Sequence, residues 1–187
     1  MKKISLNTLI KRIRLVVLDV DGVLTDGTIH VSGAGDELKT FHVHDGSGIK
    51  YLQRAGIEVA ILSGRTARAV NRRAAELGIR HVLQGYHVKA DGLDKLLKAT
   101  RVATEQVCFM GDDLPDIPVM RKVGLAVSVP NGRPEVRRIA HWVTRARGGR
   151  GAVRELAEKI LRGQALWGRI VARYGLRGKG GAAGGAL

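Results

Sequence analysis

The stretch Leu15–Asp26 reads L-V-V-L-D-V-D-G-V-L-T-D. An apolar run with strand character, Leu15–Val20, carries two aspartates one residue apart at its end, and a glycine follows at once. Because residues i and i+2 of a strand point the same way, we expect Asp19 and Asp21 to face one pocket where the strand ends. Two carboxylates at such a place can bind a divalent cation and divide nucleophilic and acid/base work between them.

Short β-like runs alternate with helical stretches along the rest of the chain. This alternation is typical of βαβ units, which build a mainly parallel sheet covered by helices on both faces. The predicted fold class is therefore α/β, with an open doubly wound sheet that binds ligands at the carboxyl ends of its strands. The predicted strands are Leu15–Val20, Glu58–Ser63, His81–Leu83, Val107–Gly111 and Ala126–Val129, and the predicted helices are Gly48–Arg54, Thr66–Leu77, Lys89–Thr100, Asp116–Lys122 and Pro134–Ile139.

One segment, Gly27–Val43, interrupts this alternation with two β-like runs around a turn at Ser32–Asp36. The pattern predicts a β-hairpin inserted directly after the first strand. A hairpin of this size buries little by itself, so we expect its apolar face to contact another subunit. The two faces of its second run are Leu38, Thr40 and His42 on one side and Lys39, Phe41 and Val43 on the other.

The C-terminal part begins with a long helical pattern, Arg154–Tyr174, which Gly163 and Gly168 weaken. The remaining residues, Gly175–Leu187, are rich in Gly, Ala and Lys and predict a disordered tail. The sequence thus predicts a single domain over residues 1–174, a size that suits one hydrophobic core.

Composition limits the setting in which the protein works. No apolar run approaches the ~18 residues of a transmembrane helix, so no membrane partner is expected. Met1–Arg14 has interspersed Lys and Arg instead of the uninterrupted apolar core of a signal peptide. Cys108 is the only cysteine, which excludes an internal disulfide and favours a reducing, cytoplasmic setting.

The net charge of +15 belongs mainly to the C-terminal part. Lys and Arg number 17 against 14 Asp and Glu up to Asp116, but 15 against 3 from Ile117 onward. Three interpretations are open: steering of anionic small molecules, adhesion to nucleic acid, and a compositional bias towards Arg, Ala and Gly. Because aromatic residues make up only 4% of the chain and rarely alternate with basic ones, nucleic acid is not an expected partner.

Two further strand ends carry candidate phosphate ligands. Ser63 and Gly64-Arg65 follow the run Glu58–Leu62. A hydroxyl and free backbone N–H groups at the start of a helix form a phosphate cradle there, and the alternative is a serine that only caps the helix. Lys89 begins the helix after Leu83, against the direction of the helix dipole, a cost that a bound phosphate removes. The alternative there is a solvated lysine.

A fourth strand end is acidic. The run Val107–Met110 leads into G-D-D-L-P-D, which places Asp112, Asp113 and Asp116 close together. Carboxylates this close repel one another unless a cation lies among them, and the alternative is a solvated acidic turn that caps the next helix. Hard oxygen ligands favour Mg²⁺, which keeps several waters and bridges to phosphate.

Taken in order, D-x-D, S-G-R, Lys and G-D-D-x-x-D resemble the four motifs of the haloacid dehalogenase superfamily of phosphatases. The resemblance implies that Asp19 is the nucleophile and forms an aspartyl-phosphate. It implies that Asp21 protonates the departing alkoxide and then activates the hydrolytic water. Ser63 and Lys89 would then hold the transferring phosphoryl oxygens.

The same resemblance implies the metal ligands. Mg²⁺ would be held by Asp19, by the main-chain carbonyl of Asp21 and by Asp112. Asp113 and Asp116 would orient metal-bound waters and the neighbouring lysine.

A finer resemblance covers about Ile13–Ile160. The segments D-V-D-G-V-L-T-D-G, F-H-V-H-D-G-S-G-I-K-Y-L (Phe41–Leu52), I-L-S-G-R and G-D-D-L-P-D-I-P-V-M are similar to the 3-deoxy-D-manno-octulosonate 8-phosphate phosphatase subfamily. It implies a capless enzyme of lipopolysaccharide precursor synthesis in which the hairpin replaces a lid. It also implies a homotetramer whose neighbouring subunits complete each active site. Arg65 is a candidate ligand for the carboxylate of the substrate.

The segment Gly148–Glu155 resembles the C-terminal G-G-x-G-A-x-R-E signature of that subfamily. It would place Arg150 and Arg154 over a neighbour's sugar acid, and the alternative is an ordinary loop before the last helix. Two other functions are weighed: a phosphatase for nine-carbon, sialic-acid-type sugar phosphates, and a non-catalytic domain that binds nucleic acid or a partner. The set Asp19, Asp21, Ser63, Lys89 and Asp112 argues against the second.

Overall fold

The computed structural model describes residues 4–31, 33 and 37–176. Its main sheet has strand order β5-β4-β1-β6-β7-β8, and every neighbouring pair is parallel. The order runs in opposite directions on the two sides of β1, which makes the end of β1 the point where such sheets bind ligands. The strands are β1 (Leu15–Leu18), β4 (Glu58–Leu62), β5 (His81–Leu83), β6 (Val107–Met110), β7 (Leu125–Ser128) and β8 (Trp142–Val143).

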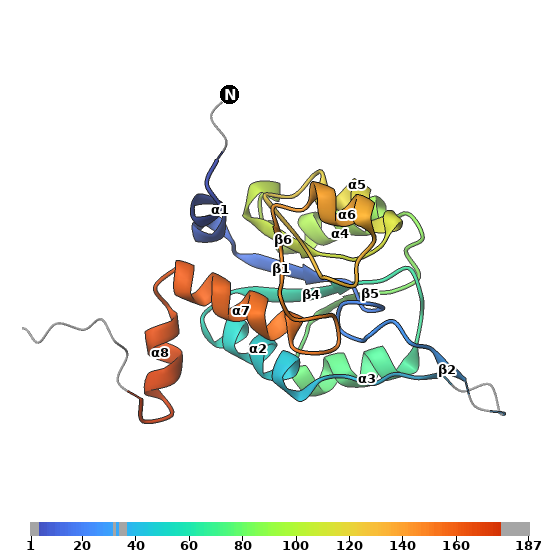
Figure 1. Ribbon diagram of the computed structural model, residues 1–187, viewed down its shortest axis with the longest axis horizontal. Coiled ribbons are helices and arrows are strands. Elements are labelled where there is room, and N and C mark those ends of the chain that lie inside the picture. The colour runs from blue at the N-terminus through green and yellow to red at the C-terminus, as the bar shows by residue number, and fades with distance from the viewer. Residues whose placement is uncertain (1–3, 32, 34–36, 177–187) are drawn as a thin grey trace, which may run out of the picture.

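Helices cover both faces of this sheet, as predicted (Figure 1). The side chains of β1 alternate between the faces: Val16 and Leu18 pack into one hydrophobic cluster, and Leu15 and Val17 into the other. The first cluster lies under α2 (Val43–Arg54), α3 (Arg68–Leu77) and α7 (Ala152–Gly163), and the second under α4 (Lys89–Thr100), α5 (Ile117–Met120) and α6 (Pro134–Ile139). Two 3₁₀ turns, η1 (Thr104–Gln106) and η2 (Leu114–Asp116), flank β6.

The predicted hairpin is present between β1 and α2. Its strands β2 (His30–Val31) and β3 (Glu37–Leu38) pair antiparallel, with Val31 opposite Glu37. The hairpin projects from the body at the right of Figure 1. Most of the predicted turn, Ser32–Asp36, lies outside the described residues.

Several element boundaries differ from the prediction. Strand β1 ends at Leu18 instead of Val20, and α3 begins at Arg68 instead of Thr66. Helix α2 begins at Val43, five residues before the predicted Gly48, although Gly and Ser have low helical propensity. Its first turns pack against α7, so tertiary contact outweighs local preference there.

The C-terminal helical pattern forms two helices, so the prediction of one long helix was wrong. Helix α7 ends at Gly163, and α8 (Trp167–Ala172) follows after a break in which Ala165 has φ 57°. The Gln164 amide donates to the carbonyls of Ile10 and Ile13, which ties the break to the end of α1 (Leu6–Arg12). The predicted tail lies outside the described residues from position 177 onward. No described helix is long and apolar enough to cross a membrane.

Candidate active site

The residues at the end of β1 form a buried charged centre. The Lys89 ammonium group lies 2.9 Å from Oδ1 of Asp19 and 2.5 Å from Oδ1 of Asp116. All three side chains are at least nine-tenths buried. Asp19 directly follows β1, Lys89 is the first residue of α4, and Asp116 ends η2. Three segments of the chain thus meet at the carboxyl end of the sheet.

Asp112 joins this centre as an acceptor without a donor. Carboxylate oxygens of Asp19, Asp112 and Asp116 lie within 4.8 Å of one another. Oδ1 of Asp112 is buried and has no hydrogen-bond partner among the described residues. A buried carboxylate oxygen that faces other carboxylates is stable only when a cation or a proton compensates it. This donor set therefore fits a hard divalent cation.

The pKa values of two of these carboxyl groups reflect the crowding. Burial, followed by the charge of Asp116, raises the pKa of Asp19 to about 7. Burial, followed by the charge of Asp19, raises the pKa of Asp112 to about 8. Lys89 opposes both effects, and despite its own burial the neighbouring aspartates raise its pKa. Without a cation, one lysine does not compensate three carboxylates.

Local structure explains why the motif residues have these identities. Gly22 has φ +89°, and a Cβ atom there would lie 2.0 Å from Oδ2 of Asp112. Only glycine therefore fits directly after the D-x-D pair. Oδ2 of Asp116 accepts the backbone N–H groups of Asp112 and Asp113 at 2.9 and 3.1 Å. The spacing G-D-D-x-x-D thus folds the acidic loop back on its last aspartate.

Asp21 is not among the carboxylates that gather within 4.8 Å of one another around Asp19. Because β1 ends at Leu18, Asp21 lies in the turn that follows, and its carboxylate forms an ion pair with Lys39 of the hairpin. Arg65 also lies near this carboxylate, with Nε 3.8 Å from Oδ2 of Asp21. The carboxylate group that joins Asp19 and Asp112 belongs instead to Asp116.

Ser63 and Arg65 follow β4, the neighbour of β1. Ser63 is buried, and its hydroxyl accepts the backbone N–H of Arg65 at 3.2 Å. Helix α3 begins only at Arg68, with Ala67 as its N-cap residue. The helix was predicted to begin at Thr66, so two further residues separate the triplet from α3. The capping alternative for Ser63 fails for this reason.

Asp113 stands apart from the other three aspartates of the site. Its side chain is exposed and accepts the backbone N–H of Leu114 at 2.8 Å, which caps η2. The structure thus divides the acidic loop between a buried centre and a solvated cap. Lys89 is contacted by Asp116 and not by Asp113, so of these two residues Asp116 orients the lysine.

The Gly-rich segment before α7 packs against the loop after β1 of the same chain. The N–H of Gly149 donates to the carbonyl of Val23 at 2.8 Å. Asn131 bridges the two segments, since its amide donates to the carbonyl of Gly22 and accepts from the N–H of Gly148. Sequence reasoning missed Asn131, because nothing in its local pattern points to this contact.

The two arginines of this segment differ in their surroundings. Arg150 is exposed and lies 3.3 Å from Asp26. Arg154 bonds Glu158 at 2.8 Å and stacks over the ring of Tyr51, with its guanidinium carbon 4.8 Å from the ring centroid. Arg154 therefore serves the packing of α7 on α2 within this chain.

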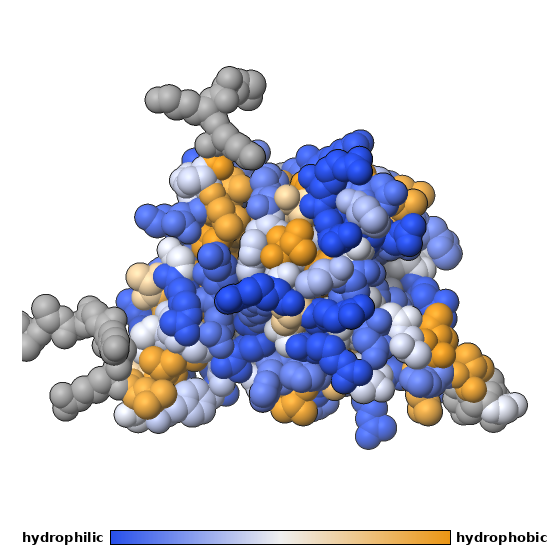
Figure 2. All heavy atoms as spheres, in the orientation of Figure 1, coloured by the Kyte–Doolittle hydropathy of each residue, from blue (hydrophilic) through white to orange (hydrophobic). Residues whose placement is uncertain are grey.

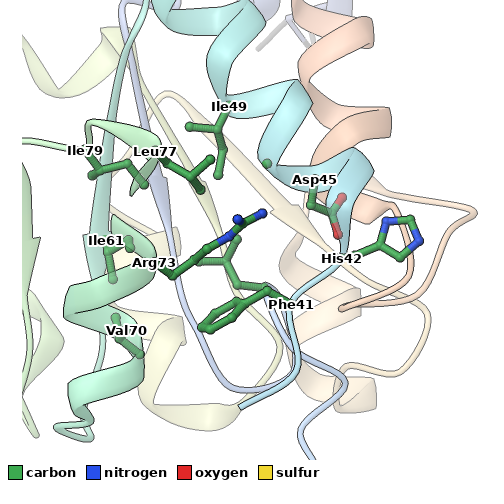
Figure 3. A pocket seen from close by; sticks show the side chains of 11 residues that line it. Phe41, His42, Asp45, Ile49, Ile61, Val70, Arg73, Leu77 and Ile79 are labelled. Carbon is green, nitrogen blue, oxygen red and sulfur yellow. The ribbon is translucent and has the colours of Figure 1, made fainter. Parts of the chain in front are cut away.

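The small cavity of Figure 3 is not the reaction centre. Its volume of about 10 Å³ has room for one water molecule at most. It lies between α2, α3 and the end of the hairpin, and its lining includes Phe41, Asp45 and Arg73 but none of the predicted site residues. The Asp45 carboxylate accepts the N–H groups of Gly151 and Arg154, so it caps α7.

Comparisons with known proteins point to one family. Residues 81–156 match the family described as haloacid dehalogenase-like hydrolase. The chain is 49% identical over 154 residues to the 3-deoxy-D-manno-octulosonate 8-phosphate phosphatase of Escherichia coli K12, which covers 82% of each protein. The corresponding Yersinia pestis enzyme is 48% identical over 152 residues, 81% of each chain.

Solved structures agree as well. A Moraxella catarrhalis 3-deoxy-D-manno-octulosonate 8-phosphate phosphatase, in complex with a magnesium ion, a phosphate ion and a KDO molecule, superposes with a TM-score of 0.88. It is 40% identical, over 90% of this chain and 97% of that one. The cobalt-bound enzyme of Haemophilus influenzae gives a TM-score of 0.82 at 39% identity, over 84% and 92%. The chain therefore belongs to the haloacid dehalogenase superfamily, in the family of 3-deoxy-D-manno-octulosonate 8-phosphate phosphatases.

Proposed function

We propose that this protein is a Mg²⁺-dependent phosphatase that converts 3-deoxy-D-manno-octulosonate 8-phosphate into 3-deoxy-D-manno-octulosonate and inorganic phosphate. The observation that carries the proposal is the buried centre at the end of β1, where Lys89 contacts Asp19 beside the unpartnered Asp112 carboxylate. A nucleophile, a cation for phosphoryl oxygens and ligands for a metal then meet at one point. The 49% identity to an enzyme with this activity supports the choice of substrate.

The metal ligands in this proposal are Asp19, Asp112 and the main-chain carbonyl of Asp21. The orphaned Oδ1 of Asp112 supports the assignment, since a cation gives this buried oxygen its missing partner. Bound Mg²⁺ would supply charge neutralisation for the phosphoryl group. Asp116 contacts Lys89 and the backbone of the acidic loop, and so orients both.

The reaction itself runs through the side chains of the chain. A carboxylate oxygen of Asp19 attacks phosphorus, the bond from phosphorus to the sugar oxygen breaks, and Asp21 protonates the departing oxygen. Asp21 then removes a proton from a water molecule, which attacks the aspartyl-phosphate and releases inorganic phosphate and free Asp19. Ser63 and Lys89 hold the phosphoryl oxygens during both steps, where negative charge develops.

Arg65 is the proposed ligand for the carboxylate of the sugar acid. Its side chain is half exposed beside Asp21, so its guanidinium is accessible from the mouth of the site. A guanidinium pairs with a carboxylate through two parallel hydrogen bonds. Nine-carbon sugar acids carry the same group, but the family relationship does not favour them as the main substrate.

A panel of phosphate esters tests the choice of substrate. With Mg²⁺, we expect kcat/KM for the octulosonate ester to exceed that for a simple hexose phosphate by at least about 100-fold, because a hexose phosphate leaves Arg65 without its anion. The nine-carbon ester should fall between them. Arg65→Met should remove most of the difference, and a chelator should stop turnover of every ester. Equal kcat/KM for the octulosonate and hexose esters would contradict the assignment.

We further propose that the hairpin takes part in a homotetramer. Leu38 and Val31 of the hairpin are 64% and 67% exposed, and Figure 2 shows hydrophobic side chains beside the grey residues at that end of the molecule. Val88 and Leu114 follow β5 and β6 and are also exposed, so apolar side chains surround the carboxyl edge of the sheet. Exposed apolar groups gathered around one site favour coverage by a second copy.

Light scattering of the purified protein tests the assembly. The wild type is expected at four times the 20.2 kDa mass of one chain. Leu38→Asp should yield smaller species, because a charge buried at the contact is costly. Leu176→Asp is the matched control, since Leu176 is 62% exposed but lies beyond α8. A monomeric wild type would refute the proposal.

The remaining features of the proposal follow the family resemblance. The reaction belongs to lipopolysaccharide precursor synthesis in the cytoplasm, and residues 1–174 act as one catalytic domain.

A further inference from the structure

A ring of four charged side chains joins the hairpin to Asp21. Lys39 forms ion pairs with Asp21 and with Oε1 of Glu37, the latter at 2.6 Å. Arg65 lies 2.9 Å from Oε2 of Glu37 and 3.8 Å from Asp21. Positive and negative groups therefore alternate around the ring. Its members come from the turn after β1, from the hairpin and from the turn after β4.

Lys39 is the least exposed member of this ring. Its side chain is only 2% exposed, against 51% for that of Arg65 and 23% for that of Asp21. The two carboxylates raise the pKa of the Lys39 ammonium group against the opposing effect of burial, while Lys39 lowers the pKa of Glu37. A buried ammonium group between two carboxylates has little freedom to move.

The chain on either side of Lys39 is held in place. Phe41 lies two residues further on and packs against the core at the small cavity, where its ring and Arg73 lie side by side (Figure 3). The guanidinium carbon of Arg73 is 6.0 Å from the centroid of this ring. On the other side, Glu37 belongs to β3 and pairs with Val31. The hairpin thus contacts Asp21 of its own chain through Lys39, whose neighbours on both sides are held in place.

We propose that Lys39 is a positioning residue for the acid/base step, which holds the Asp21 carboxylate towards the oxygen that leaves phosphorus. This inference rests on the proposed phosphatase chemistry. Asp21 lies in a turn after β1 has ended, so no regular element fixes its side chain. Its closest charged partner among the described residues is Lys39. Glu37 in turn holds Lys39, so that the hairpin orients the acid/base group.

Two other roles for Lys39 predict different kinetics. If Lys39 bound the phosphoryl group, its loss would affect every phosphate ester alike. If it only fastened the hairpin, its loss would lower stability without altering the preference among leaving groups. Orientation of Asp21 alone predicts a defect that depends on how much the leaving oxygen needs a proton.

A comparison of leaving groups in Lys39→Met separates these roles. An alkyl phosphate releases an alkoxide that needs the proton of Asp21, whereas 4-nitrophenyl phosphate releases a phenolate that leaves without one. Because kcat/KM reports the steps up to the first chemical event, water attack does not enter it. We expect kcat/KM to fall about 100-fold for the alkyl ester and less than about 5-fold for the aryl ester.

Three further variants complete the test. Lys39→Arg should restore most of the alkyl activity, and Glu37→Gln should give a weaker loss of the same pattern, which keeps the test open if Lys39→Met folds poorly. Lys122→Met is the matched control, because Lys122 pairs with Asp94 at 3.4 Å on the surface. A thermal unfolding curve accompanies each variant.

Equal losses on the two esters, or no loss on either, would overturn the positioning role. Failure of the substrate assignment is distinguishable from this outcome. A wild type that hydrolyses aryl and alkyl phosphates but not the octulosonate ester refutes the proposed substrate, while the leaving-group comparison still reports on Lys39.

Discussion

Asp19→Asn is expected to abolish phosphate release. The amide oxygen of asparagine is a poor nucleophile, so no aspartyl-phosphate forms, and we expect kcat to fall at least about 10⁴-fold. The measurement is phosphate release from the octulosonate ester and from 4-nitrophenyl phosphate in Mg²⁺, since both esters need the nucleophile. Asp94→Asn, a change at an exposed aspartate, serves as the control.

The fold should survive this change. Burial raises the pKa of Asp19 to about 7. Without metal, the folded protein therefore keeps this proton up to about pH 7, whereas the unfolded chain loses it near the ordinary pKa of 3.8. The free energy of unfolding of the wild type therefore falls as pH rises through this interval. An uncharged asparagine avoids the loss, and Lys89 keeps Asp116 as its partner. In metal-free buffer at pH 8 the variant should melt at or above the wild-type temperature.

Asp21→Asn supplies the comparison for the second carboxylate. It should also stop turnover of the sugar ester, because neither the leaving oxygen nor the water exchanges a proton with the enzyme. Unlike Asp19→Asn, it should still form some phosphoenzyme from 4-nitrophenyl phosphate. Wild-type turnover by either variant would refute the proposed division of work.

Gly148→Ala is expected to impair both stability and activity. A Cβ atom at position 148 would lie 1.7 Å from the carbonyl oxygen of Gly22, and this backbone atom cannot move without the loop after Asp19 and Asp21. We expect a loss of about 3 kcal/mol in the free energy of unfolding. Because displacement of reacting groups by about 1 Å can cost about 100-fold, kcat should fall by a similar factor.

Gly168→Ala is the matched control for this prediction. Gly168 lies in α8, and a Cβ atom there meets nothing within 4 Å, so the change should leave the free energy of unfolding equal or slightly higher. Chemical denaturation and steady-state kinetics measure both effects. Wild-type values for Gly148→Ala would show that the Gly-rich segment does not hold the loop.

Much of the fold follows from local patterns. The apolar runs at β1, β6 and β7 predict strands because all of their residues are buried, and nearly continuous apolar sequence is typical of such strands. The runs at β4 and at the half-buried edge strand β5 are also apolar enough to be recognised. Elements that depend on distant contacts were missed. Helix α1 is short, and β8 has only two residues, Trp142 and Val143, that extend the sheet beside β7. The break between α7 and α8 depends on Gln164 binding carbonyls of α1.

Some residues of the site likewise follow from local sequence patterns, and others depend on contacts that only the folded chain makes. Asp19, Lys89 and Asp112 were predictable, because parallel strands bring their carboxyl ends to one edge, and each residue lies within two positions of a strand end or opens a helix. Asp21 lies beyond the strand, because β1 ends two residues earlier than its apolar pattern. Asp116 proved to be the third carboxylate of the buried group, a result of the tight acidic loop.

The sequence by itself determined the order of the strands along the chain, the hairpin insertion and the chemistry of the strand ends, because spacing along one chain controls these features. Only the tertiary structure decided which charges meet. Lys39 reads as an ordinary lysine of a hairpin, yet it reaches Asp21, 18 residues earlier in the chain. Such a pairing depends on how the hairpin folds back and on the burial that strengthens it, and neither leaves a periodic signal in the sequence.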